Sequence, residues 1–490
     1  MSDRAYTLDG DWNALYIDGE WIDGGDRDEI EVTNPATQEK VTSVPAATED
    51  DVNRAYEAAA EAQADWADLP PSKRVGVVQS ALDLLDEHRN DILHALAVES
   101  GSANMKAFAE WQTARGITQQ AAEFPFRVGG EIKDSMIPGK ENHVKRVPMG
   151  VVGVISPWNF PFNLSMRAVA PALALGNAVV LKPASPTPVT GGLLLAKIFE
   201  EAELPEGLLN VVPGKGSEIG DRMASHPELD VMAFTGSTEV GKHVAGLAAE
   251  NLALPAMELG GNNPHVVTED ADLDAAIDSA VFGSFLHQGQ VCISINRHLV
   301  HEDVYDEYVE KLTERAEGLP IGDPTDRDNV IGPIIDEGQR DQMLDYIDST
   351  VEEGATLETG GHHDGLFVKP TVLSGATNDM AASCNETFGP IAPVIPFSSD
   401  EEAIELANDT EYGLAASVHA GDLGRAQDFA DAIDAGMVHI NDQPINEEPH
   451  VPFGGVKGSG IGRYDGDAIV EELTQEKWIS VQRNQRRYPF

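Results

Sequence analysis

A cysteine and a glutamate stand in segments that could carry out chemistry. Cys292 is one of two cysteines among 490 residues, and it ends the stretch Phe285-Leu-His-Gln-Gly-Gln-Val-Cys292. Glu258 lies upstream in Met257-Glu258-Leu259-Gly260-Gly261, next to two glycines. A free cysteine is usually a small buried hydrophobic residue, but a thiolate with a base nearby attacks carbonyl carbon. The pair predicts an enzyme of acyl chemistry.

Asn159 lies in a loop that contains two prolines, Ile155-Ser-Pro-Trp-Asn-Phe-Pro161. Because proline fixes φ, this loop can hold the amide of Asn159 in one place. A fixed N–H group is a good donor to an oxyanion. The alternative is a structural loop in which Asn159 bonds its own backbone.

Three turns after predicted strands could hold a phosphate or a ribose. Phe234-Thr-Gly-Ser-Thr-Glu-Val-Gly241 opens a predicted helix, where free backbone N–H groups attract anions. Gly214-Lys-Gly-Ser-Glu-Ile-Gly220 departs by one residue from the dinucleotide-binding glycine pattern. Lys182 ends a further strand, in Lys182-Pro-Ala-Ser185. Taken singly, each could equally be a structural turn or a surface lysine.

Other reactive residue types receive structural interpretations. His287 is expected to pack a helix rather than to pair with the thiol of Cys292. Cys384 has no base near it in the sequence and is expected to be structural. Glu447 and Glu448 lack the spacing of metal ligands, so we expect a solvated loop there and no metal site.

The charge balance excludes several partners. The chain has 83 acidic and 33 basic residues, a formal net charge of −50. Like charge repels nucleic acid and anionic membrane surfaces, so neither is an expected partner. No apolar run reaches the ~20 residues of a membrane span. Two cysteines without disulfide spacing favour a reducing cytoplasm, and scattered acidity with sparse lysine indicates a halophilic protein, because salt screens such charge.

The elements that position these residues are predicted from apolar periodicity. Apolar residues in 51–115 recur at helical spacing. After residue 145, short apolar runs alternate with helices, which indicates a mostly parallel α/β sheet. Such a sheet binds ligands at the carboxyl ends of its strands. Helices are expected over 164–175, 190–202 and 273–286, the last delivering Cys292 just beyond its end. The strand at 478–482 is expected to pair with another subunit. The remaining expected strands are 151–155, 178–181, 208–212, 231–234, 263–267, 367–373, 391–397, 414–419 and 437–441.

Seven segments, in one order, together resemble the aldehyde dehydrogenase superfamily across nearly the whole chain. They are Pro157-Trp-Asn-Phe-Pro161, Lys182-Pro-Ala184, Phe234–Gly241, Glu258-Leu-Gly-Gly261, Gly289-Gln-Val-Cys292, Glu386-Thr-Phe-Gly-Pro390 and Pro452-Phe-Gly-Gly455. Asn163-Leu-Ser-Met-Arg167 is similar to the benzaldehyde and vanillin dehydrogenase branch.

The resemblance implies an α/β fold with three parts. These are a Rossmann-like cofactor domain (1–127 and 148–258), an α/β catalytic domain (259–470) and a β-arm for oligomerisation (128–147 and 471–490). Family members are dimers or tetramers, so a homodimer or homotetramer is expected.

The resemblance also implies a reaction, the oxidation of an aldehyde to its carboxylic acid with NAD or NADP. Cys292 would form a thiohemiacetal and then a thioester, Asn159 and the backbone N–H of Cys292 would stabilise the oxyanion, and Glu258 would activate the hydrolytic water. The substrate would contact Phe160, Asn163, Arg167 and Phe453. The cofactor would contact Ile155, Ser156, Trp158, Lys182, Ser185, Gly216, Thr235, Gly236, Ser237, Val240, Gly241, Leu259, Glu386 and Phe388.

Cofactor preference and substrate stay open at this point. Members that prefer NAD often carry glutamate where this chain has Ser185, and serine does not repel a 2′-phosphate, so NADP is expected to be accepted. Arg167 would favour a dicarboxylic semialdehyde (succinic or 2-oxoglutaric) if it faces the substrate, and an aromatic aldehyde fits better if an acidic neighbour pairs with it. Glu258 argues against a CoA-acylating enzyme. A cofactor-free thiol hydrolase and a non-catalytic protein are more distant alternatives.

Overall fold

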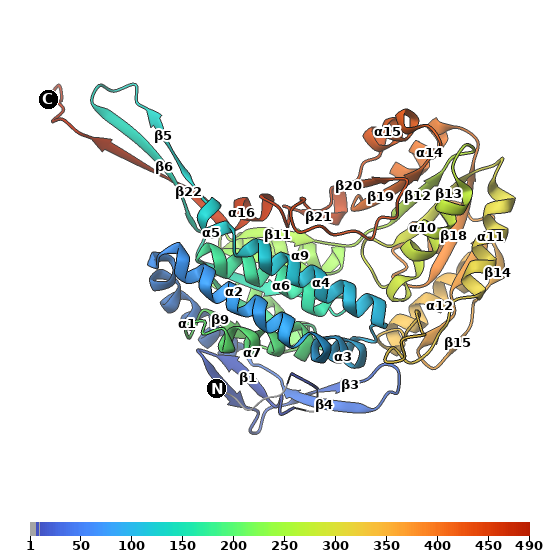
Figure 1. The fold of residues 1–490 in the computed structure, drawn as a ribbon, viewed down its shortest axis with the longest axis horizontal. Coiled ribbons are helices and arrows are strands. Elements are labelled where there is room, and N and C mark those ends of the chain that lie inside the picture. Colours follow the sequence, from blue (N-terminus) through green and yellow to red (C-terminus); the bar gives the residue numbers. More distant parts are fainter. Residues whose placement is uncertain (1–5, 9) are drawn as a thin grey trace.

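Two α/β sheets form the body of the molecule, and a thin β-arm projects from it (Figure 1). The computed structural model describes residues 6–8 and 10–490. Across these residues no helix has both the length and the apolar character that a bilayer crossing requires.

The N-terminal sheet has eight strands among the described residues, in the order β2-β1-β9-β8-β7-β10-β11-β21. The five strands from β9 to β11 run parallel, and their side chains are almost all buried because helices cover both faces. From β7 the chain builds outward to β9 and then returns to place β10 on the other side of β7, so the winding direction reverses there. The strands are β1 (Ala14–Ile17), β2 (Glu20–Asp23), β7 (Val151–Ile155), β8 (Ala178–Lys182), β9 (Leu209–Val211), β10 (Val231–Thr235), β11 (Leu254–Glu258) and β21 (Gly460–Ile461).

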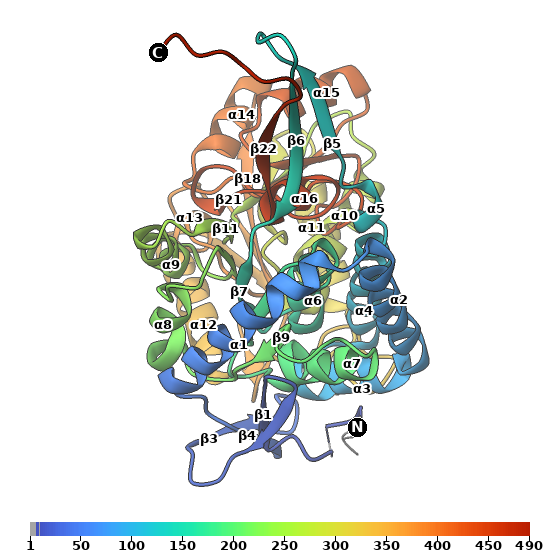
Figure 2. The same cartoon turned by 90° about the vertical axis from the view of Figure 1, so that its left-hand side faces the viewer.

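Helices pack on both faces of this sheet (Figure 2), and the expected helical region over 51–115 is confirmed. Helix α1 begins with a capping box, in which Thr48 and Asp51 bond each other's backbone N–H. The helices are α1 (Glu49–Asp68), α2 (Pro71–Glu87), α3 (Arg89–Ser100), α4 (Asn104–Ala121), α5 (Phe124–Arg127), α6 (Pro161–Leu175), the π-helical turn η1 (Val189–Leu193), α7 (Leu194–Glu201), the π-helical turn η2 (Gly216–Gly220), α8 (Asp221–Ala224) and α9 (Thr238–Glu250).

The second sheet holds seven strands of the described chain, in the order β14-β17-β18-β13-β12-β19-β20, all parallel to their neighbours except β14. Its strands are β12 (Asn263–Val267), β13 (Ile295–His301), β14 (Thr356–Thr359), β17 (Thr371–Ser374), β18 (Ile391–Phe397), β19 (Ala415–His419) and β20 (Met437–Ile440). Its helices are α10 (Leu273–Phe285), the 3₁₀ turn η3 (Leu286–Gly289), α11 (Tyr305–Glu317), α12 (Glu337–Glu352), α13 (Ala381–Cys384), α14 (Asp400–Asn408) and α15 (Leu423–Ala432).

The arm is an antiparallel sheet in the order β22-β6-β5 (upper left in Figure 1). Helix α16 (Ala468–Leu473) leads into β22 (Thr474–Gln482), which pairs over its whole length with β6 (Lys140–Pro148) of the same chain. The expected pairing of β22 with another subunit stays a prediction for its other edge. Strand β5 (Gly130–Asp134) pairs with the other edge of β6. The outer edges of β22 and β5 therefore remain the edges of this sheet. Two small hairpins and one 3₁₀ turn complete the fold: β3 (Glu29–Thr33) with β4 (Lys40–Pro45), β15 (His363–Asp364) with β16 (Phe367–Val368), and η4 (Lys457–Ser459).

Most expected elements are present, and three differ for identifiable reasons. The strand expected over 367–373 is broken into β16 and β17 at Pro370, which has no backbone N–H to donate. Helix α6 begins three residues earlier than expected, with Pro161 in the first turn and the Glu110 carboxylate accepting from the backbone N–H groups of Phe162 and Asn163. The helix expected over 190–202 starts as a π-helical turn, whose first N–H groups are bound by the buried carboxylate of Glu99.

Candidate active site

A cleft of about 400 Å³ opens where the winding of the first sheet reverses. The loops that follow β7, β10 and β11 line one side, and residues of the second sheet's loops and of α12 line the other. Parallel sheets bind ligands in this crevice, and its volume lies within the roughly 300–1,000 Å³ of small-molecule sites. Nine residues predicted from the sequence line it: Trp158, Asn159, Thr235, Gly236, Ser237, Leu259, Cys292, Glu386 and Phe388.

A second, smaller cavity of about 110 Å³ shares Cys292, Asn159 and Leu164 with the cleft. Its lining is mostly apolar. All four residues predicted to contact the substrate contribute to it: Phe160, Asn163, Arg167 and Phe453. Cys292 therefore lies between two cavities of different character, the larger with a more polar lining and the smaller with a more apolar lining.

An unusual turn delivers Cys292 to this position. Helix α10 ends at Phe285, and the next residues His287, Gln288 and Gly289 have φ angles of 51°, 58° and 71°. Left-handed conformations are costly for residues other than glycine, by roughly 1–2 kcal/mol each. An added Cβ at Gly289 would lie 2.1 Å from the carbonyl oxygen of Gly389, so only glycine fits there.

Two buried glutamine side chains hold this turn against the segment 332–335. The Gln288 amide donates to the carbonyl of Pro333 at 2.7 Å and accepts from the N–H of Gly332 at 2.9 Å. Gln290 Oε1 accepts from the N–H of Ile335 at 3.0 Å. Tertiary hydrogen bonds thus offset local backbone strain next to the candidate nucleophile, which is where such strain is typically found.

The amide of Asn159 is fixed beside Cys292. It is 3% exposed, and its Nδ2 donates to the carbonyl of Gln290 at 2.9 Å rather than to its own loop. The second N–H of this amide remains able to donate, because the –NH₂ group has two donors. The geometry therefore fits an oxyanion donor.

Burial raises the pKa of the Cys292 thiol to about 12, and the carboxylate of Glu386 adds to this shift. Cys292 is thus a protonated thiol in this state at neutral pH, and it needs a base or a positive charge nearby to become a nucleophile.

Glu258 ends β11 and points into the protein. It is 2% exposed, neither carboxylate oxygen has a hydrogen-bond partner within the described chain, and burial raises its pKa to about 8. Its Oε1 lies next to Gly454, where an added Cβ would approach it to 2.8 Å. Neither cavity is lined by Glu258. A buried carboxyl group without partners and with a pKa near the working pH fits a general base.

Lys182 lies outside the lining of the cleft, at the carboxyl end of β8. It is 4% exposed, and burial lowers its pKa to about 8. Its ammonium donates to the carbonyl of Pro183 at 3.1 Å, the one hydrogen bond found for it in the described chain. An ammonium has three donors, so Lys182 can still bind ribose hydroxyls or phosphate. Ser185 donates to the carbonyl of Gly214 at 3.3 Å, which leaves its oxygen able to accept.

The other predicted cofactor residues lie along the same edge of the sheet but do not line the cleft. Ser156 is turned inward, where its hydroxyl accepts from Ser165 at 2.7 Å, and Ile155 precedes it at the end of β7. Gly241 packs against Leu259, and Val240 is exposed on α9. Gly216 begins η2, and an added Cβ there would meet no atom within 4 Å.

Glu386 and Phe388 lie on the second-sheet side of the cleft, and Trp158, in the loop after β7, contacts Phe388. Glu386 accepts from the N–H of Gly261 at 3.0 Å, and burial raises its pKa to about 7. The rings of Trp158 and Phe388 meet edge to face at 5.5 Å. A carboxylate with one oxygen engaged, between aromatic rings, fits the ribose and base of a dinucleotide.

The structure corrects the expectation that Glu447 lies in a solvated loop. Its carboxylate accepts from Arg167 at 3.3 Å and from the amide of Asn163 at 2.8 Å, and its side chain is 14% exposed. The guanidinium of Arg167 also lies 4.7 Å from the ring centroids of Phe453 and Tyr464. Arg167 is therefore paired with an acidic neighbour, which was one of its two open interpretations.

His287 and Cys384 are not part of the reacting constellation. His287 is buried in the left-handed turn after α10, and its ring meets that of Phe160 at 5.7 Å. Burial lowers the pKa of His287 well below its ordinary value. Cys384 is exposed at the end of α13.

Sequence reasoning missed Glu447 as a site residue, and it missed the role of Gln288 and Gln290. A signal for Glu447 exists, because an arginine inside the apolar helix 164–175 requires an acidic partner, and the loop after the strand 437–441 supplies one. We find no sequence signal for the two glutamines.

Comparisons with known proteins agree with this geometry. The model of the aldehyde dehydrogenase family matches residues 21–479. A vanillin dehydrogenase of Corynebacterium glutamicum is 48% identical over 471 residues, which cover 96% of this chain and 97% of the relative. The NAD(+) benzaldehyde dehydrogenase of Pseudomonas putida is 44% identical over 482 residues, covering 98% of each chain.

A solved structure shows the same fold. Betaine aldehyde dehydrogenase from Staphylococcus aureus, in complex with NAD+, superposes with a TM-score of 0.94 at 35% identity, covering 97% of this chain and 96% of that chain. The resemblance carried by the seven sequence segments is confirmed, and the chain belongs to the aldehyde dehydrogenase family.

Proposed function

We propose that this chain oxidises aromatic aldehydes to carboxylic acids, with NAD or NADP as oxidant. The observation that carries the proposal is the position of Cys292 between a cleft of about 400 Å³ and an apolar cavity of about 110 Å³. A dry cavity of roughly 150 Å³ binds benzene, so the smaller cavity is of the order of one aromatic ring. Relatives named for vanillin and benzaldehyde support this substrate class.

In the proposed reaction the thiol of Cys292 gives its proton to a water molecule, its sulfur attacks the aldehyde carbon, and the C=O electron pair moves to the oxygen. The free N–H of Asn159 and the backbone N–H of Cys292 stabilise that oxyanion. A nicotinamide bound in the cleft would supply a positive charge near the thiol and an acceptor for the hydride that leaves the thiohemiacetal carbon, so that the C=O bond forms again as a thioester. Lys182, Glu386 and the turn at Gly236 would hold the dinucleotide.

Glu258 then serves as the base that removes a proton from water, and the resulting hydroxide attacks the thioester carbon and releases the acid and the thiolate. Its carboxylate lines neither cavity, so the side chain must rotate away from Gly454 to reach this water. The absence of hydrogen bonds to its oxygens leaves it free to do so.

The alternatives fit the geometry less well. A dicarboxylic semialdehyde needs a free cation in the substrate cavity, and Arg167 is already neutralised by Glu447. A CoA-acylating enzyme needs no water-activating base, whereas Glu258 has a raised pKa suited to that task. Turnover that depends on added CoA would favour that alternative.

For the cofactor, we infer that NADP is accepted because Ser185 carries no negative charge. Introducing a carboxylate with Ser185→Glu is expected to lower kcat/KM for NADP by roughly 10- to 100-fold, since like charges in contact cost several kcal/mol. The value for NAD is expected to change less. A native enzyme with a far higher kcat/KM for NAD than for NADP would contradict this interpretation.

We further propose that the chain is organised into three functional parts. Segments 1–127 and 148–258 would form the cofactor domain, 259–470 the catalytic domain, and 128–147 with 471–490 an oligomerisation arm. The separate sheets support the division, although β21 lies within 259–470 and joins the first sheet. We also propose that the protein is a homodimer or homotetramer, which the projecting arm supports. The two free cysteines support a location in the cytoplasm, and the net charge of −50 supports adaptation to salt.

The test is Cys292→Ala, with Cys384→Ala as the matched control at the other cysteine. Aldehyde-dependent NAD(P)H formation is expected to fall at least about 10³-fold for Cys292→Ala, because the nucleophile is lost, and to remain native for Cys384→Ala. Undiminished NAD(P)H formation by Cys292→Ala would overturn the proposed reaction.

A further inference from the structure

The substrate cavity has a mostly apolar lining that includes a cluster of buried polar side chains. Asn163, Arg167 and Glu447 contribute to the cavity together with aromatic and aliphatic side chains. Buried polar groups are normally fully hydrogen-bonded. Here Asn163 Oδ1 and Arg167 Nε, both on side chains about 1% exposed, have no partner in the described part of the chain.

Glu447 is the most accessible member of this cluster. One oxygen accepts from Arg167 at 3.3 Å and the other from Asn163 at 2.8 Å. A carboxylate offers about four lone-pair sites. Asp465 lies close to this cluster, and burial together with the charge of Glu447 raises the pKa of its carboxyl group well above the ordinary value. At least one acceptor site of Glu447 therefore remains for a ligand.

The charges of the cluster restrict what that ligand can be. Arg167 is paired with Glu447 and packed between the rings of Phe453 and Tyr464. An anionic ligand group would meet the carboxylate of Glu447 without a free cation to balance it. A neutral group that donates a hydrogen bond, such as a hydroxyl, satisfies an acceptor without adding charge.

We propose that Glu447 determines specificity by accepting a hydrogen bond from a hydroxyl group on the aromatic ring of the substrate. The chain then prefers hydroxylated benzaldehydes over the unsubstituted ring. This inference rests on the proposed function, since it places the aldehyde carbon at Cys292 and the ring in the same cavity of about 110 Å³.

The experiment compares kcat/KM for benzaldehyde, the 3- and 4-hydroxybenzaldehydes and their methoxy counterparts. The series includes both the 3- and the 4-hydroxyl compound, because both ring positions lie away from the reacting carbon, and the measurement decides which hydroxyl group is recognised. Native enzyme is expected to favour one hydroxylated aldehyde over benzaldehyde by roughly 10- to 100-fold, the effect of one hydrogen bond to a charged group. The methoxy compounds keep the ring oxygen but lack the donor, and they should lose that preference.

Glu447→Leu removes the acceptor and is expected to bring the ratio of hydroxylated to unsubstituted kcat/KM to within about threefold of unity. Glu447→Gln keeps a weaker, neutral acceptor and should give an intermediate ratio. Glu448→Gln is the matched control, because the neighbouring side chain is exposed, pairs with His450 and does not line the cavity. Its ratio should equal the native one.

Three outcomes separate the two proposals. Benzaldehyde turnover with a native ratio near unity, or a ratio unchanged in Glu447→Leu, overturns the role of Glu447 and leaves aromatic oxidation standing. Turnover of aliphatic aldehydes alone overturns the proposed function itself. If Glu447→Leu fails to fold, equal inhibition of native enzyme by acetophenone and by both 3- and 4-hydroxyacetophenone, ketones that cannot be oxidised at the carbonyl carbon, overturns the inference.

Discussion

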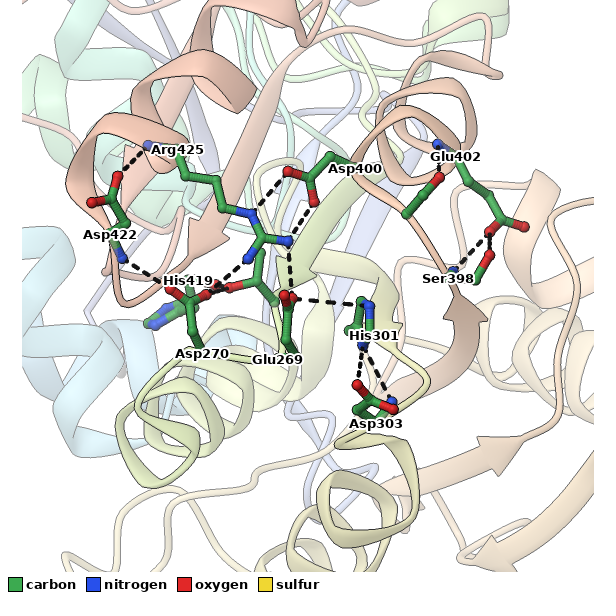
Figure 3. A network of polar contacts seen from close by, with 12 residues as sticks. Glu269, Asp270, His301, Asp303, Ser398, Asp400, Glu402, His419, Asp422 and Arg425 are labelled. Atoms are coloured by element: carbon green, nitrogen blue, oxygen red, sulfur yellow. Dashed lines mark hydrogen bonds and ion pairs between the residues drawn. The ribbon is translucent and has the colours of Figure 1, made fainter.

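Two arginines show how differently one charged group can be used in this molecule. Arg425, at the start of α15, bonds Asp400 through Nε at 2.8 Å, Asp270 at 3.1 Å and Glu269 at 2.9 Å (Figure 3). Arg167, inside α6, bonds a single carboxylate, that of Glu447, and its Nε has no partner within the described residues. Arg425 is partly exposed, with 24% of its side chain accessible, whereas Arg167 is 1% exposed.

The difference is between a saturated cluster and an unsaturated one. The Arg425 cluster connects the starts of α14 and α15 to the residues that follow β12. Its guanidinium donates hydrogen bonds to the carboxylates of Glu269, Asp270 and Asp400 (Figure 3). The Arg167 cluster is costlier, because buried charges lose hydration, yet it keeps unmet donors and acceptors beside a cavity. A cluster whose hydrogen-bonding groups are all paired is suited to holding structural elements together. A cluster with unpaired buried polar atoms beside a cavity is suited to binding a ligand.

The largest expected effect comes from removing each arginine in turn. Arg167→Met leaves the carboxylate of Glu447 half-buried without its cation, so the free energy of unfolding should fall by about 3–5 kcal/mol. Arg425→Met should cost about 1 kcal/mol, because the ion pairs it loses are partly exposed. Urea denaturation of both variants measures the difference.

The same pair tests the assignment of function. Arg425→Met should leave kcat/KM for aromatic aldehydes native, whereas Arg167→Met should lower it. The double variant Arg167→Met, Glu447→Leu should recover part of the lost stability, since no unpaired charge remains. Equal stability losses in the two single variants would refute the comparison.

Gln288 is an exception to this distinction between the two clusters. Its side-chain amide is hydrogen-bonded through both its nitrogen and its oxygen, and we nevertheless expect it to affect activity. Gln288→Met should lower kcat about 10- to 100-fold with a smaller change in KM, because the left-handed turn that carries Cys292 loses its ties to Gly332 and Pro333. The free energy of unfolding should fall by about 1–3 kcal/mol. A native kcat in a destabilised Gln288→Met variant would show that the left-handed turn keeps its conformation without the side-chain hydrogen bonds of Gln288.

How far the sequence predicts this molecule depends on the range of the interactions involved. The strands at 151–155 and 231–234 are evident because parallel strands buried on both faces are continuous apolar runs. The cleft residues could be grouped because such strands end at one edge. Pairing partners are less evident: β22 has no local signal that selects β6 of its own chain.

Two of the three residues that line both cavities, Cys292 and Asn159, are predictable from the sequence, whereas the residues that hold them in place are not. Cys292 and Asn159 stand out by residue type and flanking glycine or proline. Glu447 lies 280 residues from Arg167, and the left-handed conformation of His287 and Gln288 is imposed by hydrogen bonds to segment 332–335. Tertiary contacts of this kind override local preference.

A smaller effect is the opposite response of two glutamates to pH. Burial raises the pKa of Glu258 to about 8, so its base form, and the kcat that depends on it, should rise tenfold per unit up to about pH 8 and then level. The folded state favours the neutral carboxyl, so this group's contribution to stability is present at low pH and is lost as pH rises through about 8.

Glu269 behaves in the opposite sense, because its hydrogen bond to Arg425 lowers its pKa. Its contribution to stability is present at neutral pH and is lost as the pH falls. A kcat–pH profile for the native enzyme and Glu258→Gln checks the first statement. A rising limb that persists unchanged in Glu258→Gln would assign it to another group.

The smallest expected effect is that of salt on the Arg425 cluster. At 1 M salt the Debye length is about 3 Å, so exposed ion pairs are weakened, and the roughly 1 kcal/mol lost in Arg425→Met should shrink to less than half. The excess of acidic residues responds oppositely, because screening relieves the repulsion of a net charge of −50. The Tm of both native enzyme and Arg425→Met should therefore rise from low to molar potassium chloride while the gap between them narrows. A native Tm that falls steadily over this range would contradict salt adaptation, and a widening gap would show that the cluster is more deeply desolvated than its 24% exposure indicates.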